Sequence, residues 1–575
     1  MRDRGVESTS RATKPDGVRF GQGIRRLWIA SPARNIGYDH PDTVMASPHL
    51  SKSRYIAGLQ CLRRLWLLMH EPWEHEEAPA GSPLAVGHEI GRHAHRLFPG
   101  GVLVTEEPWQ HAQAVARTTA LMADTTVPVI FEAAFVHDDI RIRVDVLERC
   151  SDGWGLREVK SSTGVKDHHL DDVALQAHVL AEAGIAVSSA EVLHVNNAYI
   201  RGAGEVDWPA YFARVDVGDA VERRRGGVST GLLEMRECLR MEAQPPIEPS
   251  GHCHAPYGCE FWDRCTADKP ADWINHLPRL SATQAGELKA SGIEAISAIP
   301  TEFPLTWKQT IIRDATASGL PYVAPDLGRL LHGFKPPACY LDFEAMMPPV
   351  PLYAGTRPYQ AIPFQWSLHA IDGDGVLHHQ EFLAAAGEDP RRRFAETLIT
   401  ALDALTGPIV VYSAYERTQL RVLASQFFDL RPAIEAIIGR LLDLLPIVRS
   451  AVYLPEFGFS NSIKFVAPAL SPGFGYDDLD GIADGMAASS AFVQLASGTI
   501  SDLEQADQLR AALLAYCKRD TLAMVEVHRV LMRLADQVGT PARSTTTTSD
   551  ALVSSDGALS WEPPVAIQLS SPCQP

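Results

Sequence analysis

The sequence lacks a membrane span and a secretion signal. No window of the chain approaches the roughly 18 consecutive apolar residues that a spanning helix needs. The N-terminus also lacks the charged, apolar and small-residue regions of a signal peptide. These two absences predict a cytoplasmic protein without a membrane partner.

Positive charge is scarce. The 575 residues include 52 Lys and Arg against 70 Asp and Glu, so the formal net charge is −18. A chain of this sign does not coat nucleic acid through charge alone. It remains compatible with a nucleic-acid enzyme, because such an enzyme uses carboxylates to hold metal ions and needs Arg and Lys only in a local groove.

Closely spaced cysteine pairs are absent as well. The chain has nine cysteines, and three of them, Cys253, Cys259 and Cys265, share the stretch CHAPYGCEFWDRC. In a large cytosolic chain, clustered cysteines bind a metal more often than they form disulfides. A metal of this kind takes four ligands, so the three cysteines of this stretch are one ligand short of a complete set.

Length and composition indicate a globular protein with more than one core. Both ends have biased composition and are predicted to be disordered. We expect an α/β multidomain chain in this order: a disordered extension at 1–44, a first domain at 45–270, a helical linker resembling a helix-hairpin-helix at 271–332, a mixed-sheet domain at 333–537 and a disordered tail at 538–575. Translation from Met45 instead of Met1 is an alternative for the start.

The first set of candidate catalytic residues lies on a predicted hairpin. The runs IRIRVDVLER and WGLREVKS flank the turn signal CSDG. Residues two apart on a strand point to one face, so Glu158 and Lys160 project together and Asp145 can face them. Two carboxylates can hold Mg²⁺ or Mn²⁺, which activates water against a phosphodiester, and a lysine can orient that water or neutralise developing charge. Gln176, one helix later, can position a phosphate or the lysine. A surface hairpin with a Glu–Lys ion pair is the alternative interpretation.

This stretch resembles the RecB-like branch of the PD-(D/E)XK nucleases, including the iron–sulfur nucleases associated with CRISPR systems. The matching segments are SRYIAGLQCLRRLW, GHEIGRHAHRLF, RVDVLER, REVKSS, DVALQAHVL and the three late cysteines. The resemblance implies a restriction-endonuclease-like core. It also implies a metal-binding His or Glu on the helix GHEIGRHAHRLF, for which His88 or Glu89 is the candidate.

In the same family, one upstream and three downstream cysteines bind a [4Fe–4S] cluster. The resemblance therefore implies Cys61, Cys253, Cys259 and Cys265 as cluster ligands that tie together the two ends of the first domain. Four thiolates also suit zinc, which usually binds closer cysteine pairs, so the wide spacing favours the cluster. The remaining cysteines are expected to be ordinary thiols: Cys150, Cys238, Cys339, Cys517 and Cys573.

A second set of candidate residues lies in the second half of the chain. In CYLDFEAM, Asp342 and Glu344 are two apart on a predicted strand and share a face. In AYCKRDTLAM, Tyr516 and Asp520 are four apart on a predicted helix and share a face. Each pair alone is common in proteins without metal sites, so the prediction depends on their order along the chain.

This order resembles the DnaQ-like 3′–5′ exonucleases of the DEDD class, which have an RNase H-like fold. The resemblance implies that four acids bind two metal ions and that Tyr516 orients the attacking water. The implied metal ligands are Asp342, Glu344, Glu416 and Asp520. The acid of the second motif is usually Asp in that family, whereas this chain has Glu416 in SAYE, and Asp443 in RLLDLLPIV is the alternative.

Residues 46–537 together resemble an uncharacterised bacterial family that fuses these two modules. The resulting prediction is a metal-dependent nuclease that acts on DNA, on single strands or frayed ends. Three alternatives stay open: a nucleic-acid-binding adaptor with one degenerate module, an RNA-directed exonuclease, and a zinc-containing scaffold without catalysis.

Overall fold

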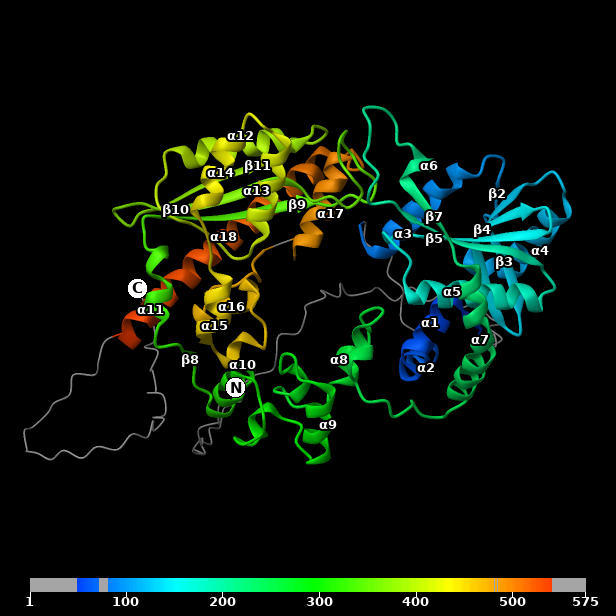
Figure 1. Ribbon diagram of the computed structural model, residues 1–575, viewed down its shortest axis with the longest axis horizontal. Coiled ribbons are helices and arrows are strands. Elements are labelled where there is room, and N and C mark those ends of the chain that lie inside the picture. The colour runs from blue at the N-terminus through cyan, green and yellow to red at the C-terminus, as the bar shows by residue number, and fades with distance from the viewer. Residues whose placement is uncertain (1–48, 72–80, 480, 483, 540–575) are drawn as a thin grey trace, which may run out of the picture. The chain divides into compact units, whose positions relative to one another are not determined.

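The computed structural model describes residues 49–71, 81–479, 481–482 and 484–539. The segments predicted to be disordered lie outside these ranges, apart from the first two residues of the tail. The described residues form an α/β structure with two large sheets (Figure 1). None of the helices in these ranges is long and apolar enough to cross a membrane.

The first sheet comes from the first half of the chain. Its order is β2-β3-β4-β5-β6-β7, and β1 pairs with β4. The strands are β1 (Leu50–Ser51), β2 (Val102–Leu103), β3 (Val129–His137), β4 (Ile140–Cys150), β5 (Gly153–Lys160), β6 (Val187–Val195) and β7 (Phe212–Asp216). The antiparallel hairpin of β4 and β5 turns at CSDG, as the sequence predicts, with Cys150 opposite Gly153.

Helices cover this sheet and supply its core. They are α1 (Lys52–Gln60), α2 (Leu62–His70), α3 (Pro83–Ala94), α4 (His111–Ala123), α5 (Asp167–Glu182), α6 (Trp208–Tyr211) and α7 (Gly218–Leu239). The short helix α8 (Trp262–Cys265) follows, and its Trp262 packs against the core of the second half of the chain. Buried apolar residues of α1, α5 and α7 share one core with β4, β5 and β6. The face of the sheet that carries Leu156 of β5 therefore packs against α5.

The segment LSKSRYIAGLQCLRRLWLL, whose early serine and helical apolar spacing predict one capped helix carrying Cys61, forms two helices. Ser51 caps α1, since its hydroxyl accepts a hydrogen bond from the Arg54 amide, as the predicted capped helix requires. Cys61 itself has extended backbone, with φ −165° and ψ 118°, and separates α1 from α2. The prediction of one continuous helix is wrong because the apolar spacing continues through the break and periodicity alone does not reveal it.

The segment between the two sheets packs with the second half of the chain. Its elements are a 3₁₀ turn (Ile274–His276), α9 (Ala282–Ala290), a 3₁₀ turn (Ile296–Ala298), α10 (Trp307–Ser318), β8 (Tyr322–Val323), α11 (Leu327–Leu330) and a 3₁₀ turn (His332–Phe334). Trp273, Ile312 and Leu327 are buried in one core with Val527 and Leu531 of the last helix. Of the two short helices predicted about Gly292, only α9 is α-helical.

The second sheet is mixed, as the sequence predicts. Its order is β11-β10-β9-β12-β13, in which β10 runs antiparallel to its neighbours and β12 runs parallel to β9 and β13. The strands are β9 (Ala338–Met346), β10 (Ile362–Ile371), β11 (Leu377–Leu383), β12 (Ile409–Val411) and β13 (Leu441–Asp443), and a small strand, β14 (Val452–Tyr453), pairs with β8. The helices are α12 (Pro390–Asp403), α13 (Tyr415–Gln426), α14 (Arg431–Arg440), α15 (Leu445–Ala451), α16 (Ile463–Leu470), α17 (Gly485–Ala496) and α18 (Leu503–Gly539).

Alternation along β9 separates apolar from acidic side chains. Cys339, Leu341 and Phe343 share a core with α12, α13 and α14 on one face of the sheet. Because successive side chains point to opposite faces, Asp342 and Glu344 lie on the other face, where α17 and α18 pack (Figure 1). The sheet therefore directs both acids toward α18, the helix that carries Asp520.

Candidate functional site

Three carboxylates and two lysines meet on the face of the first sheet that packs against α1 and α5. The carboxylates are Asp145 of β4, Glu158 of β5 and Asp172 of α5, and the lysines are Lys52 and Lys160. We call this group the first acidic site. Glu158 and Asp172 are buried, whereas the side chains of Lys52, Asp145 and Lys160 are each between 22% and 23% exposed. One side of the site is therefore open to solvent.

Lys160 and Gln176 hold two of the carboxylates in place. The Lys160 ammonium lies 2.6 Å from Glu158 Oε1 and 2.6 Å from Asp172 Oδ2. The Gln176 amide donates to Glu158 Oε2 at 2.7 Å and to Asp172 Oδ1 at 3.0 Å. Asp145 accepts a hydrogen bond from the Val159 amide at 2.7 Å, across the hairpin. The structure thus brings together the four residues that the sequence places at this site.

Lys52 and Asp172 belong to the site but escaped the sequence analysis. The Lys52 ammonium lies 3.1 and 3.2 Å from the two oxygens of Glu158 and 3.5 Å from Asp145. Lys52 is 106 residues from Glu158 in sequence, so no local pattern reveals the contact. Asp172 could have been predicted from the sequence, because it lies four residues before Gln176 on the same helix and therefore shares its face.

The two lysines set the ionisation of these carboxylates. Burial acts to raise the pKa of Glu158, but the charges of Lys160 and Lys52 and the hydrogen bonds from Lys160 and Gln176 hold it well below its ordinary value. Burial and the Glu158 charge raise the pKa of Asp145 to about 7 and also raise that of Asp172. Glu158 is thus an anion in the folded protein, and Asp145 titrates near neutrality.

A fourth carboxylate, Glu132 of β3, lies beside this site. Phe131 pairs with Val146 and Ala133 with Val144, so Glu132 lies opposite Asp145. Its φ of 55° is in the left-handed region that non-glycine residues rarely adopt. Burial raises the pKa of Glu132, and the charges of Lys52 and Glu158 also act on it.

The metal-binding candidates on α3 lie at the margin of this group. His88 is exposed, and its charge acts on Glu132. Glu89 faces His93 of the same helix at 3.7 Å. Among the described residues, the structure records no contact of either side chain with Asp145 or Glu158.

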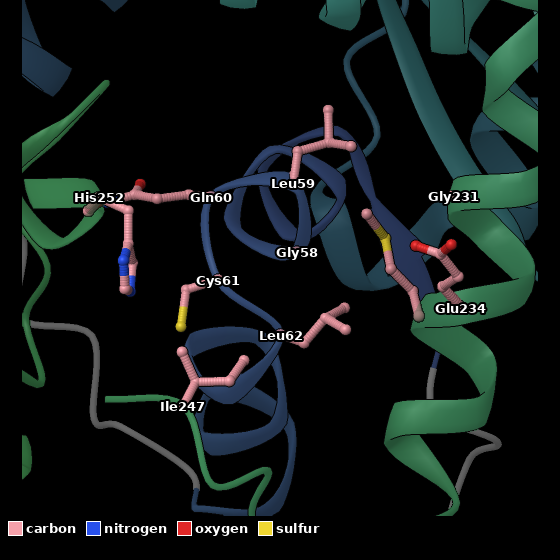
Figure 2. A pocket seen from close by; sticks show the side chains of 10 residues that line it. Gly58, Leu59, Gln60, Cys61, Leu62, Gly231, Glu234, Ile247 and His252 are labelled. Carbon is pink, nitrogen blue, oxygen red and sulfur yellow. The ribbon is translucent and has the colours of Figure 1, made fainter. Parts of the chain in front are cut away.

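The four cysteines predicted to bind a cluster line one small cavity. They are Cys61, Cys253, Cys259 and Cys265, and all four thiols are free. Cys61 also borders an adjoining cavity of about 280 Å³, in which Figure 2 shows its sulfur on the same side of the α1–α2 junction as His252. Burial raises the pKa of Cys259 to about 11 and also raises that of Cys265, and the charge of Cys253 acts in the same direction on both. Four converging thiols suit a metal that stabilises thiolates, either a [4Fe–4S] cluster or zinc.

Direct contacts join the α1–α2 junction to the cysteine stretch. The Gln60 amide donates to the His252 carbonyl at 2.8 Å and to the Tyr257 carbonyl at 2.9 Å. Arg64 pairs with Glu260 at 2.9 Å. These protein contacts hold the segment of Cys61 beside the stretch that contains the other three cysteines.

The second acidic site consists of Asp342, Glu344, Glu416 and Asp520. Asp342 and Glu344 lie on β9, Glu416 in the first turn of α13 and Asp520 on α18. Glu344, Glu416 and Asp520 are buried. The structure thus joins four acids that are spread over nearly 180 residues of sequence.

Like charges and burial perturb all four acids. Burial, followed by the charges of Asp520, Glu344 and Glu416, raises the pKa of Asp342 well above its ordinary value. Burial raises the pKa of Glu344 and of Glu416 to about 8, and that of Asp520 is also raised. The charge of Lys464 opposes the shift at Glu344 and Asp520. Three buried carboxylates and one half-buried carboxylate, with their like charges close together, are a donor set that fits hard divalent cations.

Tyrosines and a cysteine complete the second acidic site. The Tyr476 hydroxyl donates to Asp520 Oδ1 at 2.7 Å, and the hydroxyl of Tyr516 also hydrogen-bonds Asp520. Tyr476 lies in a loop and had no sequence signal. Cys517, predicted to be an ordinary thiol, instead lies 3.6 Å from Asp342 Oδ2. Ligand atoms of Asp342, Glu344 and Cys517 lie within 4.8 Å of one another, so these residues form a group that could hold a metal ion.

A cavity of about 560 Å³ opens onto this site. Asp342, Glu416 and Asp520 line it, together with Arg449 and Phe459. The alternative acid, Asp443, is not part of the lining; it accepts a hydrogen bond from the Leu445 amide at 2.9 Å, and its charge acts on Glu416. The arrangement therefore places Glu416, and not Asp443, at the cavity.

The comparison with protein families gives one match in this region. Residues 339–462 match the family described as Domain of unknown function (DUF2779). The matched segment contains Asp342, Glu344 and Glu416 but ends before Tyr516 and Asp520. Among curated proteins, no sequence matches the chain significantly. The chain is therefore similar to the DUF2779 family over the strands and helices that supply three of the four acids in the second acidic site.

Proposed function

We propose that the chain is a metal-dependent nuclease that hydrolyses phosphodiester bonds in DNA, on single strands or frayed ends. The observation that carries the proposal is the cavity whose wall contains Asp342, Glu416 and Asp520. Acids that repel one another at a cavity destabilise the fold unless protons or cations neutralise them. Divalent cations would do so and would also bind the phosphate oxygens of a substrate.

In the second acidic site, the side chains divide the work. Asp342, Glu344, Glu416 and Asp520 would hold two divalent cations, which when bound supply Lewis-acid stabilisation of the charge that develops on the phosphate and leaving oxygens. The Tyr516 hydroxyl, fixed by Asp520, orients the attacking water. In the reaction, the water oxygen bonds to phosphorus, the bond from phosphorus to the leaving oxygen breaks, and the leaving oxygen takes a proton. Arg449 of the cavity wall offers a cation to the phosphate.

In the first acidic site, Asp145 and Glu158 would hold a divalent cation. Lys160, fixed by two ion pairs of 2.6 Å, orients the attacking water or neutralises charge on the phosphate. Gln176 fixes the orientation of Glu158 through its amide. The site therefore combines a fixed cationic side chain with one buried carboxylate, Glu158, and one partly exposed carboxylate, Asp145.

For the cysteine site we propose a [4Fe–4S] cluster with a structural role, with zinc as the alternative. The convergence of four free thiols on one cavity supports a tetrathiolate site. Anaerobic purification followed by iron, sulfide and zinc analysis decides between the two metals. Cys61→Ser should lose the metal, whereas Cys238→Ser, a buried thiol outside the cavity lining, should retain it.

A nuclease panel tests the proposal. End-labelled single- and double-stranded DNA and RNA are incubated with the full chain and Mg²⁺ or Mn²⁺. Glu158→Gln should lower the cleavage activity of the first acidic site by about a hundredfold or more. The double variant Asp342→Asn with Asp520→Asn should lower the activity of the second acidic site by a similar factor. Asp152→Asn, on the exposed turn of the same hairpin as Glu158, and Asp507→Asn, on the exposed side of α18, are matched controls.

Two outcomes of the panel contradict the proposal. Intact substrates under all metal conditions would exclude a nuclease. Cleavage of DNA that survives both sets of active-site changes would assign the activity to a contaminant. Cleavage of RNA alone would retain the nuclease chemistry but replace the proposed substrate.

A further inference from the structure

Lys52 lies at the centre of the first acidic site. Its ammonium nitrogen is 3.1 Å from Glu158 Oε2, 3.5 Å from Asp145 Oδ1 and 4.0 Å from Asp172 Oδ1. It comes close enough to Glu158 to contact both carboxylate oxygens. One cation thus lies within 4.0 Å of all three carboxylates of the first acidic site.

The two lysines of the site occupy different positions. Lys160 bridges Glu158 and Asp172 at 2.6 Å from each. Lys52 instead bridges Glu158 and Asp145, which are the two carboxylates that the proposed function assigns to the metal. A divalent cation between Glu158 and Asp145 would repel the Lys52 ammonium, because both would bring positive charge to the same pair of carboxylates.

We propose that Lys52 is a further functional residue of this site, whose ammonium group alternates with a divalent cation on Asp145 and Glu158. In the metal-free protein Lys52 neutralises the carboxylates and keeps the site folded. When the cation binds, the ammonium leaves Asp145 and Glu158 and becomes available to a phosphate at the open side. The inference rests on the proposed use of metal by this site.

The backbone of Lys52 is fixed, so the exchange needs only side-chain motion. Lys52 is the first residue of α1 and follows the β1 strand, which pairs with β4 at Ile140 and Arg141. Farther along α1, a Cβ added to Gly58 would lie 2.7 Å from the Met235 side chain, so the helix packs closely on α7. The flexible four-carbon stem of lysine and its partial exposure permit the ammonium to move while α1 stays in place.

Binding of Mn²⁺ without substrate tests this inference. The full chain carries Asp342→Asn and Asp520→Asn to remove binding at the second acidic site, and free Mn²⁺ is measured by electron paramagnetic resonance. Adding Lys52→Met should tighten Mn²⁺ binding by about tenfold or more, because a competing charge is lost. Lys52→Arg should bind close to the parent, and Lys289→Met, on the exposed side of α9, is the matched control. Unchanged or weaker binding by Lys52→Met would overturn the inference.

Thermal unfolding keeps the test decisive if Lys52→Met is less stable. Without metal, the variant should melt below the parent, since Glu158 and Asp145 lose a counter-ion. Saturating Mn²⁺ should narrow the gap between the two melting temperatures, whereas a purely structural ion pair would leave the gap unchanged. Neither readout uses cleavage, so tighter Mn²⁺ binding in a chain without nuclease activity would retain this inference and reject the proposed function.

Discussion

The two acidic sites lie on similar scaffolds but neutralise their charge differently. The first combines carboxylates of two adjacent strands with one carboxylate from α5, and the second combines two carboxylates of one strand with one each from α13 and α18. In the first, Lys52 and Lys160 form ion pairs with the carboxylates. In the second, burial raises the pKa of all four acids and neighbouring carboxylates add to this at Asp342 and Glu344, whereas Lys464 opposes the shift only in part. The first site is thus complete as a folded ion-pair network, whereas the second depends on protons or added cations.

The largest expected difference is in the stability of charge-removing variants without metal. Glu158→Gln leaves Lys52 and Lys160 without their shared partner and should lower the free energy of unfolding by about 3–5 kcal/mol. Asp520→Asn removes one of the four acids of the second acidic site, which repel one another when ionised, and should therefore raise the free energy of unfolding. Differential scanning calorimetry in EDTA measures both, with Asp152→Asn and Asp507→Asn as controls. If both variants changed the free energy of unfolding in the same direction, the two sites would not differ in how their charge is neutralised.

Metal addition should act mainly through the second acidic site. Mn²⁺ at about 100 times its dissociation constant should stabilise the wild-type chain by about 2.7 kcal/mol. The double variant Asp342→Asn with Asp520→Asn should lose most of this gain, because the first site already contains Lys52. Thermal shifts with and without Mn²⁺ provide the measurement. An equal gain in the double variant would place the stronger metal site elsewhere.

The pH dependence of stability should have one sign at Glu344 and Glu416 of the second site and the opposite sign at Glu158 of the first. Burial raises the pKa of Glu344 and Glu416 to about 8. Their contribution to the stability of the fold is therefore present at low pH, when both are protonated, and is lost as the pH rises toward 8. The charges of Lys160 and Lys52 lower the pKa of Glu158 despite its burial. Glu158 therefore contributes to the stability of the fold at any pH above the ordinary pKa of a glutamate, and this contribution is lost in acid. In EDTA, stability should fall by about 1–2 kcal/mol between pH 5 and 8, since one pKa unit corresponds to about 1.4 kcal/mol and coupled acids share the shift. Glu344→Gln should flatten this slope in melting curves, and a slope that persists would contradict the assignment.

The smallest effect is expected at Lys464. This residue is partly exposed, and its ammonium lies 4.7 Å from the centre of the Tyr516 ring. Lys464→Met should change the free energy of unfolding by about 1 kcal/mol or less, because exposed charge interactions are screened. Chemical denaturation in EDTA measures the change. A loss as large as that of Glu158→Gln would mean that the second site also depends on a built-in cation.

Much of both sites was predictable because strand and helix periodicity fix which side chains share a face. The hairpin at CSDG puts Asp145 in register with Glu158, whose face Lys160 shares, and the i, i+4 spacing puts Tyr516 beside Asp520. The mixed second sheet followed from strand runs that precede alternating helices and strands. These inferences use local geometry, which a single sequence contains.

Contacts between distant segments were not predictable from local geometry. The capped helix at Ser51 was foreseen, but not that its first residue, Lys52, reaches Glu158. Tyr476 lies in a loop between α16 and α17, where no periodicity applies. Cys517 was expected to be inert because nothing in the sequence shows that β9 runs beside it. Each of these side chains acquires its role only when the sheet and helices pack.

Glu132 has a consequence for engineering this protein. Its φ of 55° costs about 1 kcal/mol for an L residue, and a glycine at this position would remove that cost. A redesign selected only for thermal stability would therefore favour Glu132→Gly. The same change would delete a carboxylate opposite Asp145 and shift the charge balance that Lys52 maintains. At position 132, selection for thermal stability would therefore favour glycine, whereas selection for activity would favour glutamate.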